Sequence, residues 1–241
     1  MTGKGAPTAA RRLPAQVRLY RQVADALEER LASGEFKSGD RLPTERELSA
    51  YYSVSRTCVR EALLALEIAG LVSIRVGSGV FVTSPPPAER LHLEPKPDQV
   101  SLTEILDARV MFEPEICAAA AASAKAEDIA RLSAALNRMR DEHRKAADTE
   151  HGDRDFHLAI AHACGNAIAQ NLLQEIWMEI SAPLWQGMLR HIRTPILRLK
   201  WIEDHEAILA AIELQDRRKA RAAMRRHIEN VVESLMREDL L

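Results

Sequence analysis

Apolar positions near the start of the chain recur every fourth residue and predict a helix over 19–31. Thr44, followed three residues later by a glutamate, forms a capping box that starts a second helix. Ser55 has the position of an N-cap for a third helix, which lasts until Gly70. Only a short turn separates the last two helices. The pattern therefore predicts a helix-turn-helix within 42–71.

The pattern changes from helical to alternating after the third helix. Residues 71–74 and 80–82 alternate as short strands do, and the turn between them contains Gly77 and Gly79. This arrangement predicts a β-hairpin, which would form a wing beside the helix-turn-helix.

The rest of the chain reads as a linker followed by helices. Residues 84–97 are rich in proline, which makes a linker semi-rigid. Every later apolar pattern is helical, and Pro114 is expected to kink the first of these helices or to end a turn within it. We predict a mainly α protein in three parts: a winged helix-turn-helix with a small β-hairpin over 1–84, a linker over 85–100, and an all-α bundle of six or seven helices over 101–241.

Net charge becomes informative when the chain is divided. The whole chain carries 33 Lys and Arg against 35 Asp and Glu, a net charge of −2. Residues 1–84 carry 12 basic and 9 acidic residues, net +3, and the remainder carries 21 and 26, net −5. The basic part is the predicted DNA-binding part. So small an excess indicates that binding depends on individually placed arginines and on a dimer that doubles the contacts.

The third helix has the chemistry of a major-groove recognition helix. Arg56 and Arg60 are four residues apart and so share a face, from which a guanidinium can bind the O6/N7 edge of guanine. Hydroxyls and amides at the helix N-terminus can hold phosphate. The alternative for these arginines is an ordinary solvated helix face. The predicted DNA-binding residues, on the outer face of the helices and in the wing, are Arg46, Ser55, Arg56, Thr57, Arg60, Gly77 and Gly79.

Three ordered segments carry a family resemblance: GDRLPTEREL, VSRTCVREAL and GLVSIRVGSGVFV. They resemble the winged-helix signature of the GntR family of bacterial transcription regulators. The resemblance implies a regulator of double-stranded operator DNA, expected to be a repressor. Because one winged helix offers few specific contacts, we expect a homodimer on two half-sites. Cys58 stands where the family usually has Pro or Thr, so the family's operator preference is not carried over.

Four ligand-type residues stand out in the helical part. Asp153 and His157 are four residues apart on one predicted helix face, and His205 and His227 lie on the last two helices. One carboxylate and three imidazoles suit a borderline divalent cation, and zinc, nickel, cobalt, manganese and iron are all chemically possible. Taken singly, each histidine is more often an ordinary core or surface residue.

A second resemblance covers this part of the chain. The segments DRDFHLAIAHACGN, EDHEAILAAIELQD and ARAAMRRHIENVV resemble the FCD-type effector domain of the FadR subfamily of GntR regulators. The resemblance implies that Asp153, His157, His205 and His227 bind a metal, with zinc the metal expected first. It also implies a small organic acid effector whose carboxylate pairs with Arg109, for which an intra-bundle salt bridge is the alternative. Asn166 and Trp185 are weaker effector-binding candidates, for which the alternatives are a helix-boundary residue and a core residue respectively.

Two other functions remain open at this point. The metal itself could be the signal, in a directly metal-responsive regulator. A metal-dependent hydrolase is a further alternative, because a three-histidine, one-carboxylate centre can activate water. No general base or nucleophile can be assigned from the sequence, so we do not expect an enzyme.

The sequence also carries expectations about the cellular compartment. Three cysteines without paired spacing fit a reducing cytoplasm. No segment reads as a signal peptide or membrane span, so we expect a cytoplasmic protein that does not bind membranes.

Overall fold

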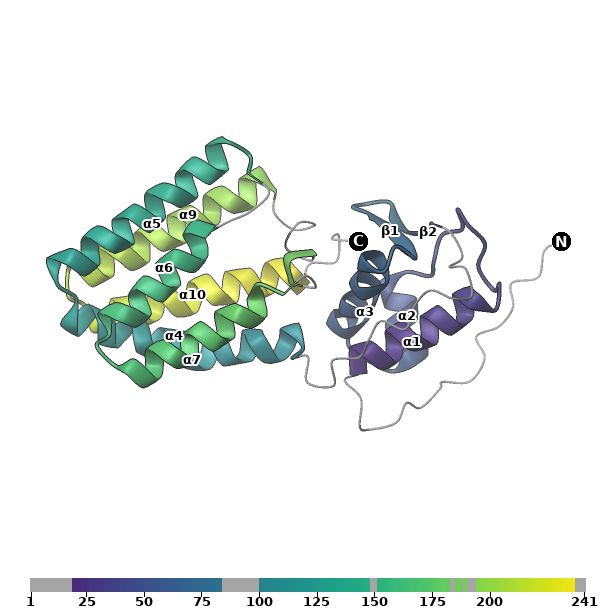
Figure 1. Ribbon diagram of the computed structural model, residues 1–241, viewed down its shortest axis with the longest axis horizontal. Coiled ribbons are helices and arrows are strands. Elements are labelled where there is room, and N and C mark those ends of the chain that lie inside the picture. The colour runs from purple at the N-terminus through teal and green to yellow at the C-terminus, as the bar shows by residue number, and fades with distance from the viewer. Residues whose placement is uncertain are drawn as a thin grey trace. The chain divides into compact units, whose positions relative to one another are not determined.

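A computed structural model describes residues 19–83, 100–147, 151–182, 185–187, 189 and 194–236. The chain divides into two compact units, one formed by Met1–Ser101 with Met236–Leu241 and the other by Leu102–Leu235. Figure 1 labels their helices and strands. The linker predicted over 85–100 lies almost wholly outside the described residues.

The first unit contains three helices followed by a hairpin. The elements are α1 (Leu19–Ala32), α2 (Glu45–Tyr52), α3 (Arg56–Ile68), β1 (Val72–Arg75) and β2 (Gly79–Val82). The two strands pair in antiparallel register from Val72↔Val82 to Arg75↔Gly79. Backbone hydrogen bonds join the segment before α2 to β2, with Leu42 N donating to Val80 O at 2.8 Å. The predicted winged helix-turn-helix is confirmed.

Local capping explains where α2 and α3 begin. The Thr44 hydroxyl accepts from the backbone N–H of Glu47, and the Glu47 carboxylate accepts from the backbone N–H of Thr44 at 2.8 Å. Ser55 caps α3 by accepting from the backbone N–H of Cys58. Between them, Ser53 adopts a left-handed conformation with φ 57°, which ends α2. The short turn therefore sets the direction of α3.

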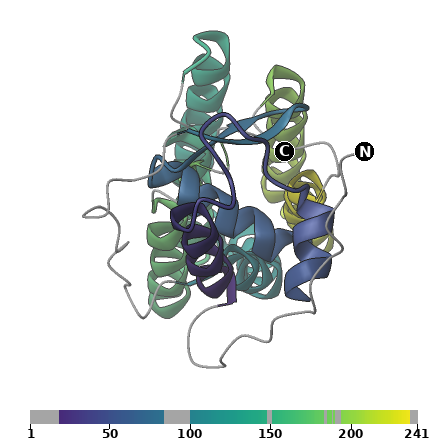
Figure 2. The ribbon, with the colours of Figure 1, turned by 90° about the vertical axis from the view of Figure 1, so that its right-hand side faces the viewer.

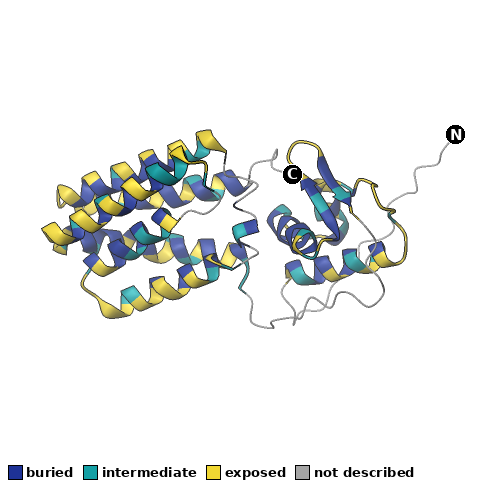
Figure 3. Cartoon of the chain, turned by 45° about the horizontal axis from the view of Figure 1, so that its top comes forward, coloured by how far each residue is buried: buried dark blue, intermediate teal, exposed yellow. Residues whose placement is uncertain are grey.

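The described part of the second unit is all-α. Its helices are α4 (Leu102–Ser123), α5 (Ala126–Arg144), α6 (His151–Ala163), α7 (Ala167–Ile180), α9 (Pro195–Glu213) and α10 (Arg217–Met236). Helix α5 packs on α6 and α9, and α4 packs on α6, α7 and α9. Figure 2 gives a second view of the helices, and Figure 3 shows that each turns a buried stripe inward. Among the described residues, no helix is both long and apolar enough to span a membrane.

The expected helix toward Ser123 is present as α4, which runs from Leu102 to Ser123 with Pro114 buried inside it. The surrounding bundle holds α4 together despite the backbone hydrogen bond that a proline removes. This continuity matters for the site, because Arg109 and Glu113 both precede the proline on α4.

Candidate metal centre and nucleic-acid interface

The four residues predicted as metal ligands lie together in the second unit. Helix α6 contributes Asp153 and His157, α9 contributes His205 and α10 contributes His227. One ligand atom from each lies within 4.8 Å of those from the other three. His205 Nε2 is 3.1 Å from Asp153 Oδ1 and 3.2 Å from His157 Nε2. The three imidazoles are essentially buried.

Each histidine turns its other ring nitrogen toward an oxygen. His157 Nδ1 lies 2.5 Å from Glu113 Oε2, and His205 Nδ1 lies 2.6 Å from the carbonyl oxygen of Trp201. His227 Nδ1 is 3.6 Å from the Asp204 carboxylate. A neutral imidazole that donates from Nδ1 presents the lone pair of Nε2, as metal-bound histidines do.

This orientation provides a test of whether a cation fits. With both Nδ1 atoms acting as donors, the Nε2 lone pairs of His157 and His205 face each other at 3.2 Å, with a carboxylate oxygen beside them. Such lone pairs repel unless a positive charge lies between them. Three nitrogen donors and one carboxylate oxygen suit a borderline divalent cation. The residues present therefore fit a divalent metal.

Burial and mutual contact also perturb the pKa values in the cluster. Burial and the neighbouring His205 lower the pKa of His227 to about 3, which favours its neutral form. Burial acts to lower the pKa of His157, but the nearby carboxylates of Glu113 and Asp153 outweigh it and raise that pKa. Burial acts to raise the pKa of Asp153, but hydrogen bonding to His157 and His205 holds it well below its usual value.

A close approach between α5 and α6 fixes the start of the helix that carries Asp153. A Cβ atom at Gly152 would lie 2.6 Å from the backbone nitrogen of Met139, so only glycine allows this contact. The Glu142 carboxylate accepts from the N-terminal amides of α6, those of His151 and Gly152, each at 3.1 Å. These contacts hold the start of α6 close to α5, and this position directs Asp153 into the bundle.

Arg109 lies against the cluster on α4. Its Nε donates to Glu113 Oε1 at 2.6 Å, and its Nη2 is 3.4 Å from His157 Nε2. The same guanidinium lies 4.9 Å from the centre of the Trp177 ring. Burial acts to raise the pKa of Glu113, but Arg109 and His157 outweigh it and lower that pKa to about 2. The alternative interpretation of Arg109, an intra-bundle salt bridge, is observed. Its guanidinium also reaches the cluster, and its pairing with an effector stays a prediction.

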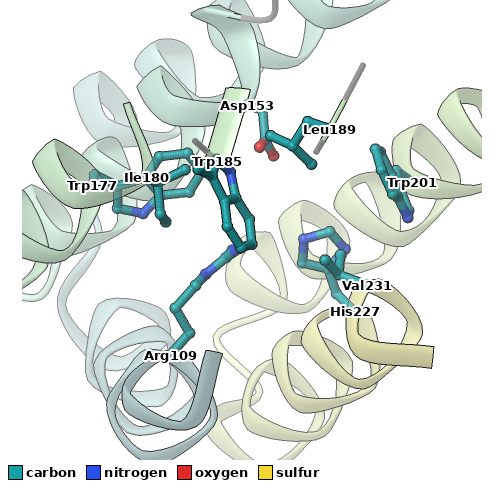
Figure 4. A pocket seen from close by; sticks show the side chains of 9 residues that line it. All are labelled: Arg109, Asp153, Trp177, Ile180, Trp185, Leu189, Trp201, His227 and Val231. Carbon is teal, nitrogen blue, oxygen red and sulfur yellow. The ribbon is translucent and has the colours of Figure 1, made fainter. Parts of the chain in front are cut away.

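A small cavity opens beside these residues. Its volume is about 20 Å³, and it is enclosed by Arg109, Asp153, Trp177, Ile180, Trp185, Leu189, Trp201, His227 and Val231. Figure 4 shows their side chains arranged around it. A cavity of this size has room for about one water molecule.

Trp185 and Asn166, both predicted to bind the effector, have different positions. Trp185 lines the cavity. Asn166 is exposed and does not line it; its side chain caps α7 by accepting from the backbone N–H groups of Ile168 and Ala169. The alternative role of Asn166, as a helix-boundary residue, is therefore observed, and its contact with an effector stays a prediction.

The predicted DNA-binding residues also differ in exposure. Arg46 and Ser55 are exposed and Arg56 is half-buried, whereas Thr57 and Arg60 are buried. Arg60 forms a bidentate pair with the Glu45 carboxylate, with Nε–Oε1 at 2.7 Å and Nη2–Oε2 at 2.6 Å. Arg56 Nη2 lies 3.7 Å from the same carboxylate. Arg56 and Arg60 do share a face, but placing Thr57 and Arg60 on the outer surface was wrong. Both are buried, and α2 presents Glu45 to Arg60.

The wing glycines have structural reasons for their identity. Gly77 and Gly79 have positive φ values of 72° and 107°, which glycine adopts at little cost. A Cβ at Gly79 would lie 2.5 Å from Arg41 Nε, so the Arg41 side chain lies directly over the turn. Arg75 lies over the Phe81 ring at 4.5 Å. The wing therefore presents two exposed arginines, Arg41 and Arg75, which the sequence reasoning did not single out.

Comparisons with known proteins assign the family. Residues 19–82 match the bacterial regulatory proteins of the gntR family, and residues 104–230, more than half of the chain, match the FCD domain. This chain belongs to the GntR family. The predicted family and its FadR-type arrangement of a GntR helix-turn-helix and an FCD domain are confirmed.

Relatives of this GntR-family regulator are themselves named as regulators. The chain is 38% identical to the Uxu operon regulator of Haemophilus influenzae over 217 residues, covering 89% of this chain and 80% of that protein. It is 35% identical to the Uxu operon transcriptional regulator of Escherichia coli, covering 91% and 87%. Among solved structures, E. coli McbR/YncC matches with a TM-score of 0.51 and 24% identity over 91% of this chain and 98% of that chain. The GntR-family protein is thus a DNA-binding transcription regulator and not an enzyme.

Several residues of the regulator's site were missed from its sequence. Glu113 could have been noticed from its position four residues after Arg109, which places both on one helix face. Trp177 and Trp201 gave no comparable signal, because a tryptophan in a helical pattern is ordinarily a core residue. Glu45, which binds Arg60, falls in the first turn of α2, where an acidic residue is favoured in any case.

Proposed function

We propose that this regulator is a cytoplasmic repressor that binds operator DNA as a homodimer and is controlled by a small organic acid and a divalent metal. Asp153, His157, His205 and His227 would hold the metal, for which zinc is our first choice. The main observation in support is that the Nε2 atoms of His157 and His205 face each other at 3.2 Å, beside the Asp153 carboxylate. The NanR repressor of Klebsiella aerogenes, 32% identical over 92% of this chain, supports the repressor assignment.

The acid-binding part of the proposal rests on Arg109. Four protein ligands leave positions on a six-coordinate cation, and a bound cation would supply Lewis acidity for a carboxylate there. Arg109 is held by Glu113 through Nε, so the rest of its guanidinium can contact an anion. Such an acid would connect α4 to the three helices that carry the ligands.

The acid can act only as far as it binds one arrangement of the protein better than another. A tenfold loss of operator affinity requires about 1.4 kcal/mol of coupling, which is within the range of a single charge-assisted hydrogen bond. The alternative, a directly metal-responsive regulator, uses the same four ligands and differs only in which molecule carries the signal.

The exposed face of α4 and α7 supports the homodimer. Met111 and Phe112 on α4 and Ile168, Leu172 and Met178 on α7 are large apolar side chains exposed to solvent, and the two helices pack against each other. Where such exposed apolar side chains form one contiguous patch, they mark a surface that binds another protein. The mass of the protein in solution, measured by light scattering at micromolar concentration, tests this part of the proposal; a monomer contradicts it.

Measuring operator binding with the metal and the acid added separately tests the whole proposal. The protein is stripped with a chelator, and the affinity for a labelled operator is measured alone, with zinc, and with zinc plus each acid. We expect the acid to change the affinity only when zinc is present. A full response to zinc alone would favour the metal-responsive alternative, and no response to either would reject the proposal. Arg109→Lys keeps the charge but loses the planar guanidinium, so it should bind zinc and fail to respond to acid.

A further inference from the structure

All three tryptophans of the protein line the small cavity that Arg109 and His227 also line. Trp177 lies on α7, Trp201 on α9, and Trp185 between these helices in the sequence. The three side chains are buried, with exposures of 3%, 7% and 2%. Figure 4 shows the indoles on different sides of the cavity, with Arg109, Asp153 and His227 between them.

The three indole N–H groups share a second property. Each Nε1 atom is buried and has no hydrogen-bond acceptor among the described residues. A buried tryptophan N–H ordinarily finds a partner, because leaving a buried donor unsatisfied costs stability. Three such donors around one cavity indicate that the missing acceptors belong to a molecule that enters it.

The remaining lining restricts what that molecule can be. Among the described lining residues, Arg109 adds further donors and the only carboxylate is that of Asp153, already counted among the proposed metal ligands. The other described lining residues are the apolar Ile180, Leu189 and Val231 and the ligand His227. A cavity rich in donors and poor in acceptors suits an anion with several oxygen acceptors.

We infer that the indole N–H groups of Trp177, Trp185 and Trp201 donate hydrogen bonds to the effector and select acids that carry oxygen atoms besides the carboxylate. This inference rests on the proposed function, since it assumes that an acid enters beside the metal. Trp177 lies against both Arg109 and His157: its ring centre is 4.9 Å from the guanidinium carbon of Arg109 and 4.9 Å from the imidazole centre of His157. Trp201 already contacts the cluster, because its carbonyl oxygen binds His205.

The size of the cavity adds a consequence. At about 20 Å³ it has room for about one water molecule, so even a three-carbon acid requires lining side chains to move. The indoles are large and form much of the wall. Binding of the acid therefore changes their surroundings directly, and tryptophan signals report on this site alone.

The direct test observes the indole N–H groups in the intact protein. Protein labelled with ¹⁵N in tryptophan and loaded with zinc, which is diamagnetic, gives three indole cross-peaks. Propionate, lactate and glycerate are added in turn, because they share three carbons and one carboxylate and differ in having no, one and two hydroxyl groups. Gluconate extends the series. We expect affinity to rise along it, with downfield proton shifts of at least two indoles for glycerate and gluconate.

Single Trp→Phe substitutions separate a hydrogen-bonding role from packing. Each removes one N–H and keeps an aromatic ring, and should weaken glycerate or gluconate binding by about fivefold to tenfold, the effect of one hydrogen bond. Propionate has no hydroxyl group, so its affinity for each Trp→Phe variant should differ from its affinity for wild type by less than about twofold. Equal weakening for all acids would assign the tryptophans a packing role only and overturn the inference.

The outcomes also distinguish this inference from the proposed function. If zinc-loaded wild type binds none of the acids, as measured by its melting temperature and by the indole spectrum, both fail. If it binds propionate as tightly as glycerate and gluconate, or binds acids with no movement of the indole cross-peaks, the proposed function stands and the selection by tryptophan is wrong.

Discussion

Each unit of the regulator contains a buried group of charged side chains, and the two groups differ in how they are completed. In the first unit, the Glu45 carboxylate binds Arg60 through two hydrogen bonds and lies near Arg56. In the second, Asp153 and three histidines direct ligand atoms to one point. The first group is neutralised within the protein, whereas the second gathers lone pairs that need a cation.

This difference supports a structural role for the first group and the proposed metal site for the second. A buried bidentate pair holds its own elements together, here the N-terminus of α2 against α3, and leaves little capacity for a ligand. A cluster of imidazoles whose Nδ1 atoms are already held by oxygens is oriented for a further partner. Burial and charge alone do not separate the two cases; the direction of the ligand atoms does.

The largest expected effect concerns the second group, Asp153 with the three histidines. His227→Ala should reduce zinc affinity by on the order of a thousandfold, because it removes a ligand outright and even partners outside the ligand set change affinity by about 10–100-fold. Competition against a chromogenic chelator measures it. His162→Ala is the matched control, since His162 is exposed and pairs with Asp128 away from the cluster. Stoichiometric zinc in His227→Ala at wild-type affinity would remove this cluster as the metal site.

The next largest effect concerns the first group, the buried pair of Glu45 and Arg60. Glu45→Gln keeps the shape but removes the negative charge that two hydrogen bonds hold against the buried Arg60 guanidinium, so the first unit should lose about 3 kcal/mol of stability. Glu35→Gln is the control, because Glu35 pairs with Arg30 at the surface and should cost less than about 1 kcal/mol. Urea denaturation followed by circular dichroism compares them. Equal losses would mean that the buried pair is not the structural element described here.

A smaller effect is expected at the residue that joins Arg109 to the cluster. Glu113→Gln should weaken zinc binding by about 10–100-fold, because Glu113 accepts from His157 Nδ1 and thereby directs Nε2 at the metal. Cobalt loading gives a second readout, since its visible absorption responds to ligand geometry and not to stability. Glu115→Gln, an exposed residue on the same helix that pairs with Arg221, should leave both unchanged. An unaltered cobalt spectrum in Glu113→Gln would show that Glu113 does not orient His157.

The two groups also differ in how far the sequence could predict them. The helix-turn-helix followed from caps at Thr44 and Ser55, which act within a few residues. The four ligands followed from spacing together with the family resemblance. The burial of Arg60 did not follow, because periodicity gives the face of a helix but not what packs against it. Trp177 and Trp201 were missed for the same reason: the cavity that they line is formed by several helices and has no pattern along the chain.

An effect similar to that of Glu113→Gln, or smaller, is expected for the predicted DNA-binding residues of the first unit. Arg56→Ala should cost about 1–3 kcal/mol in operator affinity if its guanidinium contacts a base, whereas Arg60 is committed to Glu45. Fluorescence anisotropy with operator and random DNA measures the difference. Arg41→Ala and Arg75→Ala in the wing provide the comparison. If Arg56→Ala weakens both DNAs equally, Arg56 contacts phosphate and the predicted base contact is wrong.

The smallest expected effect concerns Asp128, whose carboxylate is already paired within the second unit. Its carboxylate accepts from the backbone N–H of Lys125 at 3.1 Å and lies near Arg131 and His162. The backbone hydrogen bond from Lys125, helped by His162, lowers the pKa of Asp128 against a smaller opposing effect of burial. A carboxyl with a lowered pKa stabilises the fold above the pKa of the unfolded chain, and this stability is lost as the pH falls through the folded value.

Asp128→Asn should therefore cost about 1 kcal/mol near pH 7, comparable to the loss of a helix cap. The difference from wild type should shrink as the pH falls below about 4, where the unfolded carboxyl becomes protonated. Denaturant titrations at pH 7, 5 and 3.5 follow it, with Asp155→Asn, an exposed partner of Arg138, as control. A difference that stays constant with pH would show that the hydrogen-bond geometry of Asp128, and not its charge, stabilises the start of α5.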